Sequence, residues 1–356
     1  MIKRLMDIKK RDYSRYYLSI NPFPYTPIPE QEPFLYINQE KTITGLLNTI
    51  STTYHTGRSS HAVLIGPYGS GKSHALKYIE RIIVEQDKNL EKKSLACYIS
   101  SLGTSFKHIY REFMENIGLA LIQKIIKDID TDDFHYNISQ ILKALKENGD
   151  LHAWRWFLGE TLEGRERSRL GISRNIDDIL ALALFQTVIH LLHKNGFNLI
   201  CLLIDELETI NELYPYQRQA MFNNLRRMID DNTRGLCSVY ACTPAGWDEI
   251  LGRSLAFSRR LSRNQFYLSR LSEKETIQVI GEYHRFFRIL PEIYEVTIDE
   301  VYPFTLEACR ELYQFSGGNI GELVKYCNLA IDRAIDCGLK EIDSPDITNL
   351  LAEFRA

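Results

Sequence analysis

Eight consecutive residues near the start of the chain have the types and spacing needed to hold a polyphosphate. Gly66-Pro-Tyr-Gly-Ser-Gly-Lys-Ser73 fits the pattern Gly-x-x-x-x-Gly-Lys-Ser/Thr. Its glycines let backbone N–H groups turn inward around an anion. Lys72 would reach the β- and γ-phosphates, and Ser73 would coordinate Mg²⁺. The residues that we expect to contact the nucleotide are Gly66, Pro67, Tyr68, Gly69, Ser70, Gly71, Lys72, Ser73 and His74.

The segments on either side of this loop favour the same interpretation. His61–Ile65 is a short apolar run that predicts a buried strand, and residues 75–84 carry apolar side chains at helical spacing. A helix that begins near Lys72 directs its N-terminal N–H groups and the positive end of its dipole at a bound phosphate. The alternative is a chance turn rich in glycine and serine, which explains neither the strand nor the helix. The sequence therefore predicts a nucleotide-binding protein.

An acidic pair farther along the chain could complete the catalytic site. The apolar run Leu199–Ile204 predicts a buried strand that leads directly into Asp205 and Glu206. A carboxylate at the carboxyl end of a strand beside a phosphate loop can hold Mg²⁺. The following glutamate is placed to orient and deprotonate a water molecule aimed at the γ-phosphate. We therefore predict Ser73 and Asp205 as Mg²⁺ ligands and Glu206 as the general base, with a solvated strand end as the alternative.

Two further groups could sense or stabilise the transferred phosphoryl group. Thr243 follows a strand predicted over residues 237–241, and its hydroxyl could contact the γ-phosphate or only cap a turn before Pro244. The cluster Ser258-Arg-Arg-Leu-Ser-Arg263 precedes the last predicted strand. Arginine is a planar, permanently charged group that suits developing phosphoryl charge. A solvated basic helix face is the competing interpretation of this cluster.

The elements that would position these residues alternate between strand and helix. This alternation predicts an α/β fold with a parallel sheet flanked by helices. A long stretch with helical periodicity separates the second strand from the third, and only helices are predicted after residue 271. The expected strands are residues 61–65, 94–101, 199–204, 237–241 and 264–268. The expected domains are a basic, proline-rich arm (1–38), an α/β domain (39–271, with a helical insertion at about 106–194) and a helical lid domain (272–356).

Composition excludes several classes of protein. The net charge of −3 argues against a generally basic protein that coats nucleic acid. The seven cysteines include no Cys-x-x-Cys pair, which favours reduced thiols in a cytoplasmic protein over a disulfide or zinc framework. The N-terminus is too charged for a signal peptide, and the longest apolar run is too short to span a bilayer. We therefore expect no membrane partner.

Together these motifs resemble those of an AAA+ ATPase, over about residue 39 to the C-terminus. The entry segment Asn21-Pro-Phe23 is similar to that of the initiator-like branch, which contains origin-recognition and transposition-regulator ATPases. A narrower resemblance links residues 151–244 to the ATP-binding proteins of BREX-type phage-defence systems. It rests on Trp154-Arg-Trp-Phe-Leu-Gly159, on Gly196-Phe-Asn-Leu-Ile-Cys-Leu-Leu-Ile-Asp-Glu-Leu-Glu208 and on Ala241-Cys-Thr-Pro244.

The resemblance implies that ATP is bound at a subunit interface. It implies a ring or helical homo-oligomer, often around double-stranded DNA. In such an assembly Arg259 or Arg260 would act as an arginine finger on the ATP of the neighbouring subunit. Arg263 is a further candidate for this finger. Many relatives carry a phosphate-sensing arginine in the pattern Gly-x-x-Arg. In Gly318-Asn-Ile-Gly321 a glycine stands at that position, and Lys325, one helical turn later, is a possible replacement.

We therefore expect an ATP-hydrolysing switch that uses ATP and Mg²⁺, assembles on DNA and works with a protein partner of a defence or mobile-element system. One alternative is a nucleotide-gated scaffold with little turnover, which the glycine at position 321 favours. Another is an initiator-like loader without the winged-helix domain of its relatives, because the chain ends at Ala356. DNA would then contact the basic arm or a set of arginines that could equally form a solvated loop: Arg155, Arg165, Arg167, Arg169 and Arg174.

Overall fold

The computed structural model describes residues 11–24, 39–87, 93–130, 134, 136–289 and 299–355. The chain divides into two compact units, which we describe separately. One unit, here the sheet unit, comprises residues 41–66 and 75–267. The other, here the helical unit, comprises residues 1–40, 67–74 and 268–356. The phosphate loop therefore groups with the helical unit, although its chain continues directly from the first strand.

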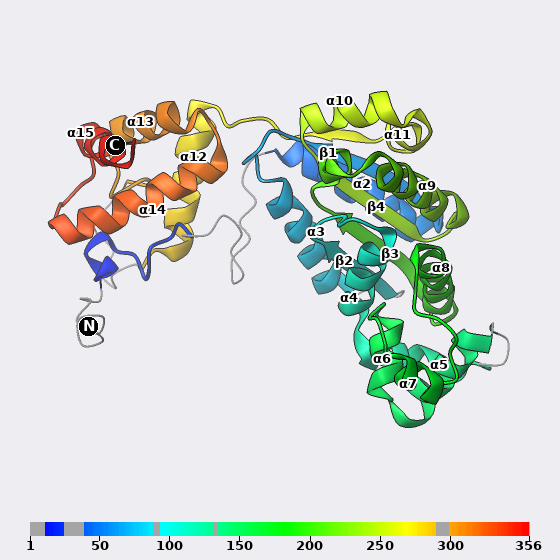
Figure 1. Cartoon of the computed structure of the whole chain (residues 1–356). Coiled ribbons are helices and arrows are strands. Elements are labelled where there is room, and N and C mark those ends of the chain that lie inside the picture. The colour runs from blue at the N-terminus through cyan, green and yellow to red at the C-terminus, as the bar shows by residue number, and fades with distance from the viewer. Residues whose placement is uncertain are drawn as a thin grey trace. The chain divides into compact units, whose positions relative to one another are not determined.

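A five-stranded parallel sheet forms the centre of the sheet unit (Figure 1). This arrangement confirms the predicted α/β fold. The three interior strands, β3, β4 and β1, are buried along nearly their whole length, as expected of a parallel sheet covered on both faces. In sheet order the strands are β2 (Lys93–Ile99), β3 (Phe197–Ile204), β4 (Leu236–Cys242), β1 (Ser60–Ile65) and β5 (Gln265–Tyr267).

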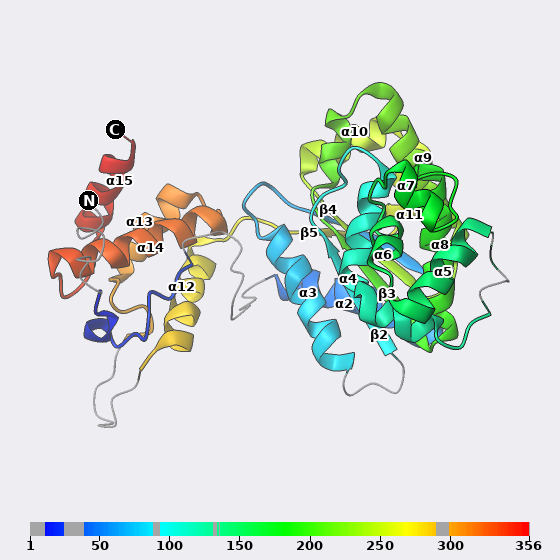
Figure 2. The same ribbon diagram turned by 60° about the horizontal axis from the view of Figure 1, so that its bottom comes forward.

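Helices cover both faces of this sheet (Figure 2). Helices α2 (Glu40–Thr56) and α3 (Lys72–Asp87) lie on one side of the strands. The other side carries α8 (Asp178–Lys194), α9 (Pro215–Asp231) and α11 (Leu255–Leu261). Alternate strand residues such as Val63, Leu202 and Tyr240 join the buried side chains of these last helices in one core, because successive side chains of a strand point to opposite faces.

The predicted helical insertion is confirmed, and it forms a lobe beside the sheet (Figure 1). It consists of α4 (Phe106–Ile126), α5 (Tyr136–Asn148), α6 (Leu151–Phe157), α7 (Gly164–Arg169) and α8. Large aromatic side chains hold it together. Trp156 and Phe157 are almost completely buried, and the rings of Phe113 and Phe185 pack with their centroids 4.7 Å apart.

Most of the arginines in this lobe have partners within it. Arg155 pairs with Glu160 and Glu166 at 2.8 and 3.3 Å. Arg169 pairs with Asp150 at 2.5 Å, and Arg174 pairs with Asp177 at 3.3 Å. Arg167 donates to the carbonyl of Ser173. These contacts favour the charged-loop interpretation over the DNA-contact interpretation for four of the five arginines, whereas Arg165 is exposed and has no such partner among the described residues.

The helical unit has its own core, built on four helices: α12 (Glu273–Phe287), α13 (Leu306–Ser316), α14 (Ile320–Cys337) and α15 (Ser344–Arg355). Each buries one apolar stripe, as the periodicity of residues 272–356 predicts. Gly318, just before α14, has a φ of 73°, and a Cβ atom there would lie 2.1 Å from the carbonyl oxygen of Leu271. Only glycine fits this close approach.

The N-terminal segment 11–24 packs on these helices. Arg11 pairs with Asp332 and Asp336 of α14 at 2.5 and 2.8 Å. Asn21 donates to the carbonyl of Asn328 and accepts from the N–H of Phe23, whose ring is buried against Tyr283 and His284. The Asn-Pro-Phe motif is therefore an anchor for the helical unit. The other basic residues of the predicted arm (Lys3, Arg4, Lys9 and Lys10) and the aromatic residues Tyr25, Phe34 and Tyr36 lie outside the described residues.

Two helices were not predicted. α10 (Pro244–Arg253) begins directly after Thr243, and α11 comes next and carries Arg259 and Arg260, whereas Arg263 lies beyond its end. Six of the seven cysteines are buried and all are free thiols. No described helix is long and apolar enough to cross a membrane.

Candidate nucleotide-binding site

The phosphate loop has the backbone conformation that its glycines predict. It leaves β1 at Gly66, whose N–H donates to the carbonyl of Cys242, and α3 begins at Lys72. Gly69 and Gly71 have φ values of 75° and 87°, a region that side chains with a Cβ rarely adopt. Gly69 lies within a turn from Pro67 to Ser70 that is closed by the hydrogen bond from Ser70 N to Pro67 O. The loop can therefore present backbone N–H groups at the start of α3.

The polar side chains of the loop are compatible with a bound phosphate. Lys72 Nζ donates to the carbonyl of Pro67 at 3.2 Å, which keeps the ammonium group on the loop. Ser70 Oγ is buried and makes no hydrogen bond with any described residue. A buried hydroxyl of this kind requires a partner, and a phosphate oxygen would provide one. Ser73 and His74 lie in the first turn of α3. The residues present therefore fit a nucleotide.

The parallel sheet brings three of the predicted elements to one edge. Gly66, Asp205 and Thr243 each follow the last residue of a strand, and the strands lie in the order β3, β4, β1. Because the carboxyl ends of parallel strands meet at one edge, the acidic pair and the threonine lie at the edge where the phosphate loop begins. Ligands bind at this edge in open α/β sheets.

Asp205 is a buried carboxylate that has no cationic partner among the described residues. It is 3% exposed, and its Oδ1 accepts from the N–H of Glu206 at 2.9 Å. Its Oδ2 accepts from the hydroxyl of Tyr98, also at 2.9 Å. Neither donor is charged, and Asp205 makes no ion pair with any described residue. A buried charge is costly without a counter-charge, so this carboxylate fits a role as a Mg²⁺ ligand, directly or through water.

Glu206, the predicted general base, has a strained backbone. Its φ and ψ are 50° and 44°, which makes it one of three described residues other than glycine with a positive φ. Such conformations cost free energy and are retained mainly at functional sites. The conformation ends β3 and begins the short 3₁₀ helix η3 (Leu207–Glu212), and it leaves the side chain of Glu206 exposed.

Glu208, by contrast, lies in the packing of η3. A Cβ atom on Gly246 would lie 2.4 Å from the Cβ of Glu208, which shows how closely η3 and α10 pack. Its Oε2 is buried and has no hydrogen-bond partner among the described residues. Glu208 is therefore half-buried, because η3 turns this side chain toward α10.

Tyr98 is a site residue that the sequence analysis missed. It lies on β2, next to β3 in the sheet, and its hydroxyl holds Asp205. Its own N–H donates to Glu80 of α3, and Lys77 of α3 lies over its ring, 5.2 Å from the centroid. Burial raises the pKa of Glu80. The sequence feature that could have indicated this role is a tyrosine one residue before the end of a predicted strand, on the face opposite Cys97 and Ile99.

Replacing Tyr98 with phenylalanine tests this connection. Loss of a hydrogen bond to a carboxylate costs about 1.5 kcal/mol or more. We therefore expect the Mg²⁺ concentration that gives half-maximal ATP binding to rise roughly tenfold. ATP binding without Mg²⁺ should be unchanged. Titration of a fluorescent ATP analogue with Mg²⁺ measures both. The control is Tyr216→Phe, the same change at a side chain that is 73% exposed. An unchanged Mg²⁺ dependence of Tyr98→Phe would contradict a positioning role.

Thr243 caps α10. Its hydroxyl accepts from the N–H of Gly246 at 3.2 Å, which is the capping alternative considered for this residue. The bond uses the oxygen as an acceptor and leaves the hydroxyl proton available as a donor. A contact with the γ-phosphate stays a prediction.

The two arginines predicted as finger residues have different surroundings. Arg260 forms a bidentate pair with Asp230 at 2.6 and 2.5 Å and also donates to the carbonyl of Ala256. This pairing lowers the pKa of Asp230. Arg259 is exposed and makes no hydrogen bond or ion pair with any described residue. Arg263 is exposed in the same way. Arg260 is therefore held by its own chain, whereas the guanidinium groups of Arg259 and Arg263 are exposed.

The start of α14 lies against the phosphate loop within the helical unit. Asn319 donates to the carbonyl of Tyr68 at 2.9 Å, and the N–H of Gly321 donates to the carbonyl of Gly69 at 3.2 Å. Gly321 is thus close to the loop but offers only its backbone. Lys325 is 57% exposed and lies 3.9 Å from Glu322.

Solved structures with a similar fold include ORC and Cdc6 proteins. ORC2 of Aeropyrum pernix in its ADPNP–ADP complexes aligns with a TM-score of 0.58 at 11% identity, covering 94% of this chain and 71% of that chain. Cdc6p of Pyrobaculum aerophilum aligns with a TM-score of 0.58 at 13% identity, covering 96% and 71%. ORC1 of A. pernix in complex with DNA aligns with a TM-score of 0.55 at 10% identity, covering 92% and 68%. No curated protein sequence matches the chain.

The sheet, its phosphate loop and these structural likenesses show that the chain has a P-loop NTPase fold of the AAA+ type, similar to the fold of the ORC and Cdc6 structures. The sequence model of the family described as "BREX system ATP-binding protein BrxC/D" matches residues 119–281. The predicted resemblance to BREX ATP-binding proteins is therefore confirmed over a range that contains Asp205, Glu206, Thr243 and the arginine cluster.

Proposed function

We propose that the protein is an ATP-hydrolysing switch that assembles with ATP. The observation that carries this proposal is the pair at the end of β3: a buried carboxylate that makes no ion pair with a described residue, followed by a glutamate in a strained conformation. In this assignment the residues from Gly66 to His74 bind ATP, and Ser73 and Asp205 hold Mg²⁺, which neutralises charge on the phosphates when bound. Glu206 accepts the proton of the attacking water, and Lys72 balances negative charge on the β- and γ-phosphates.

An ATP site between two subunits would take its phosphate loop from one subunit and Arg259 from the other. Arg259 has no hydrogen-bond or ion-pair partner in the described part of its own chain, and an arginine supplied by a neighbour can stabilise the charge that develops during phosphoryl transfer. The neighbour would thereby make hydrolysis depend on assembly. A ring or helix of subunits is the form that such a repeated head-to-tail contact produces.

Double-stranded DNA and a protein of the same defence system are the proposed partners. The A. pernix ORC1 structure is a complex with DNA, and the BrxC/D family model is that of a phage-defence system. These likenesses support the proposal for the present chain, which we place in the cytoplasm. Its free thiols agree with a reducing compartment.

One observation favours a second function, a nucleotide-gated scaffold with little turnover. Gly321 provides a backbone N–H where relatives have a phosphate-sensing arginine, and that N–H is bonded to the loop carbonyl of Gly69. A missing cation at this position weakens the link between the state of the nucleotide and the position of the lid.

Size-exclusion chromatography and steady-state hydrolysis distinguish the two functions. For the switch, we expect a monomer without nucleotide, a larger species with Mg·ATP, and a turnover that rises with protein concentration and with duplex DNA. ATP-dependent assembly without measurable turnover in any of these conditions would favour the scaffold. A protein that hydrolyses ATP as a monomer, independently of its concentration, would refute both assembly and the finger mechanism.

A further inference from the structure

Cations follow one another along the edge of the sheet that is opposite the phosphate loop. We call this set the cationic edge: Lys93, Lys194, Arg234 and Arg58. Lys93 is the first residue of β2, and the others come two or three residues before β3, β4 and β1, respectively. These are four neighbouring strands in the sheet order. Because the strands are parallel, their amino ends meet at one edge, so that the four cations form a row.

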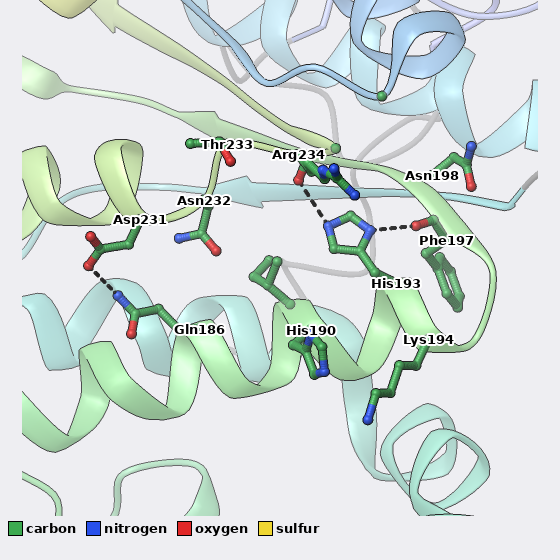
Figure 3. A pocket seen from close by; sticks show the side chains of 13 residues that line it. Gln186, His190, His193, Lys194, Phe197, Asn198, Asp231, Asn232, Thr233 and Arg234 are labelled. Carbon is green, nitrogen blue, oxygen red and sulfur yellow. Dashed lines mark hydrogen bonds between the residues drawn. The ribbon is translucent and has the colours of Figure 1, made fainter.

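Hydrogen bonds join the segments that carry these residues. Lys93 Nζ donates to the carbonyl of Asn195, next to Lys194. The ring of His193 bridges the carbonyls of Phe197 and Arg234, with its Nδ1 and Nε2 at 2.7 and 3.0 Å (Figure 3). The segments that contain Arg58 and Arg234 pair as a short antiparallel bridge. The row is therefore a continuous, bonded part of the sheet unit.

A cavity of about 740 Å³ opens along this edge (Figure 3). Its lining includes His190, Lys194 and Arg234, all exposed, and the amide side chains of Asn198 and Asn232. The acidic residue in the lining, Asp231, accepts a hydrogen bond from Gln186 at 2.6 Å. Cationic and amide side chains therefore supply most of the polar groups of the cavity, beside apolar ones such as Ile189 and Phe197.

Three of these cations have no acidic partner. Arg58, Lys194 and Arg234 are exposed and make no side-chain hydrogen bond or ion pair with a described residue. Their state contrasts with that of the arginines in the helical lobe, which are mostly paired. Arg58 and Arg234 even occupy opposite positions of one bridge. Like charges placed directly opposite one another are destabilising, and an anion bound across them would relieve that cost.

We propose that the cationic edge binds the phosphodiester backbone of duplex DNA. Neighbouring strands lie about 4.8 Å apart, so the row spreads its charges over roughly 14 Å. A duplex presents a linear array of phosphates with one charge per 3.4 Å of axis on each strand. A row of separate cations fits such a linear polyanion better than it fits a compact anion. The contacts carry no base information, so binding is tolerant of sequence.

This inference rests on the proposed function for its partner, DNA, and adds the surface that binds it. The test compares two variants with the same change in charge. One is Arg58→Gln/Lys194→Gln/Arg234→Gln, which leaves Lys93 and its bond to Asn195 intact. The matched control is Lys41→Gln/Lys274→Gln/Lys340→Gln, at three exposed positions that do not belong to the cationic edge. Fluorescence anisotropy measures binding to an arbitrary duplex over a series of salt concentrations with Mg·ATP.

We expect the edge variant to bind at least tenfold more weakly than the control. The slope of log K against log salt should become shallower by about three for each bound subunit, since each phosphate contact contributes about 0.9. ATP binding without DNA and the thermal unfolding curve check that the variant is folded.

The possible failures are distinguishable. If the wild-type chain binds DNA and both variants bind equally well, the cationic edge is not the DNA surface, although the proposed function stands. If the wild-type chain binds no DNA in any nucleotide state, DNA is not its partner, and both the cationic-edge inference and the DNA-binding part of the proposed function are wrong. If the edge variant keeps its DNA affinity and loses binding to an acidic protein instead, the edge is a protein-docking surface and the inference is wrong.

Discussion

Replacing Glu206 with glutamine is expected to stop ATP hydrolysis while leaving ATP binding intact. Glutamine keeps the size of the side chain and the adjacent ligand Asp205, but it cannot accept the proton of the attacking water. General-base catalysis of this kind contributes about 10²–10⁴-fold, so we expect kcat to fall by that factor. Single-turnover hydrolysis measures the chemical step, and a fluorescent ATP analogue measures binding.

Two other variants test whether a loss of hydrolysis with intact ATP binding is specific to the change at Glu206. Lys72→Ala should lose ATP affinity itself, because the cation that faces the β- and γ-phosphates is absent. Glu212→Gln makes the same chemical change at an exposed residue of η3, and its turnover should remain close to that of the unmodified protein. Hydrolysis at the native rate by Glu206→Gln would show that another group is the base.

Replacing Arg259 with alanine is expected to reduce hydrolysis about a thousandfold, the lower end of the effect of an arginine finger. If this arginine acts on the neighbour's ATP, mixing Arg259→Ala with Lys72→Ala protein should restore part of the activity. At some mixed interfaces the first variant supplies an intact phosphate loop and the second supplies the arginine. The measurement is the turnover at a series of mixing ratios, after incubation that allows subunits to exchange.

Arg260→Ala is the internal comparison. This arginine holds Asp230 in its own subunit, so its loss should lower the stability of the fold and should not be rescued in trans. The pKa of Asp230 is lowered in the folded state, so the stabilisation from the pair is present at neutral pH and decreases as the pH falls through that pKa. Rescue of Arg260→Ala by Lys72→Ala protein, with none for Arg259→Ala, would show that Arg260 is the arginine finger and that Arg259 is not. Absence of rescue for both would exclude a finger at either position.

The basic N-terminal segment illustrates why charge alone is an ambiguous signal. Its interleaved cations and aromatic rings are compatible with nucleic-acid contacts and equally with packing on the protein. Arg11 pairs with two aspartates of α14, Arg15 donates to the carbonyl of Gly338, and Tyr16 is buried. The partners are more than 300 positions away in the chain, and no local pattern around residues 11–16 could have indicated them.

The sequence alone determined the parts of this protein that depend on local chemistry. The loop from Gly66 to Ser73 could be recognised because glycine, lysine and serine at fixed spacing serve one backbone conformation. The strands could be recognised because a parallel sheet buries them in continuous apolar runs. The pattern Leu199–Ile204 followed by Asp205 and Glu206 combined both signals, and the structure places that pair at the edge of the sheet where the loop begins.

Tertiary structure decided what depends on neighbours distant in sequence. Tyr98 and Asp205 are 107 positions apart, and their hydrogen bond exists only because β2 and β3 are adjacent strands. Arg259 and Arg260 are indistinguishable in the sequence, yet only Arg260 meets an aspartate on α9. The cationic edge likewise joins residues from four separate segments, since strand order, rather than chain order, places their amino ends side by side. Charge and hydrogen-bonding capacity are properties of the residue, but whether they are satisfied within the chain or available to a ligand depends on packing.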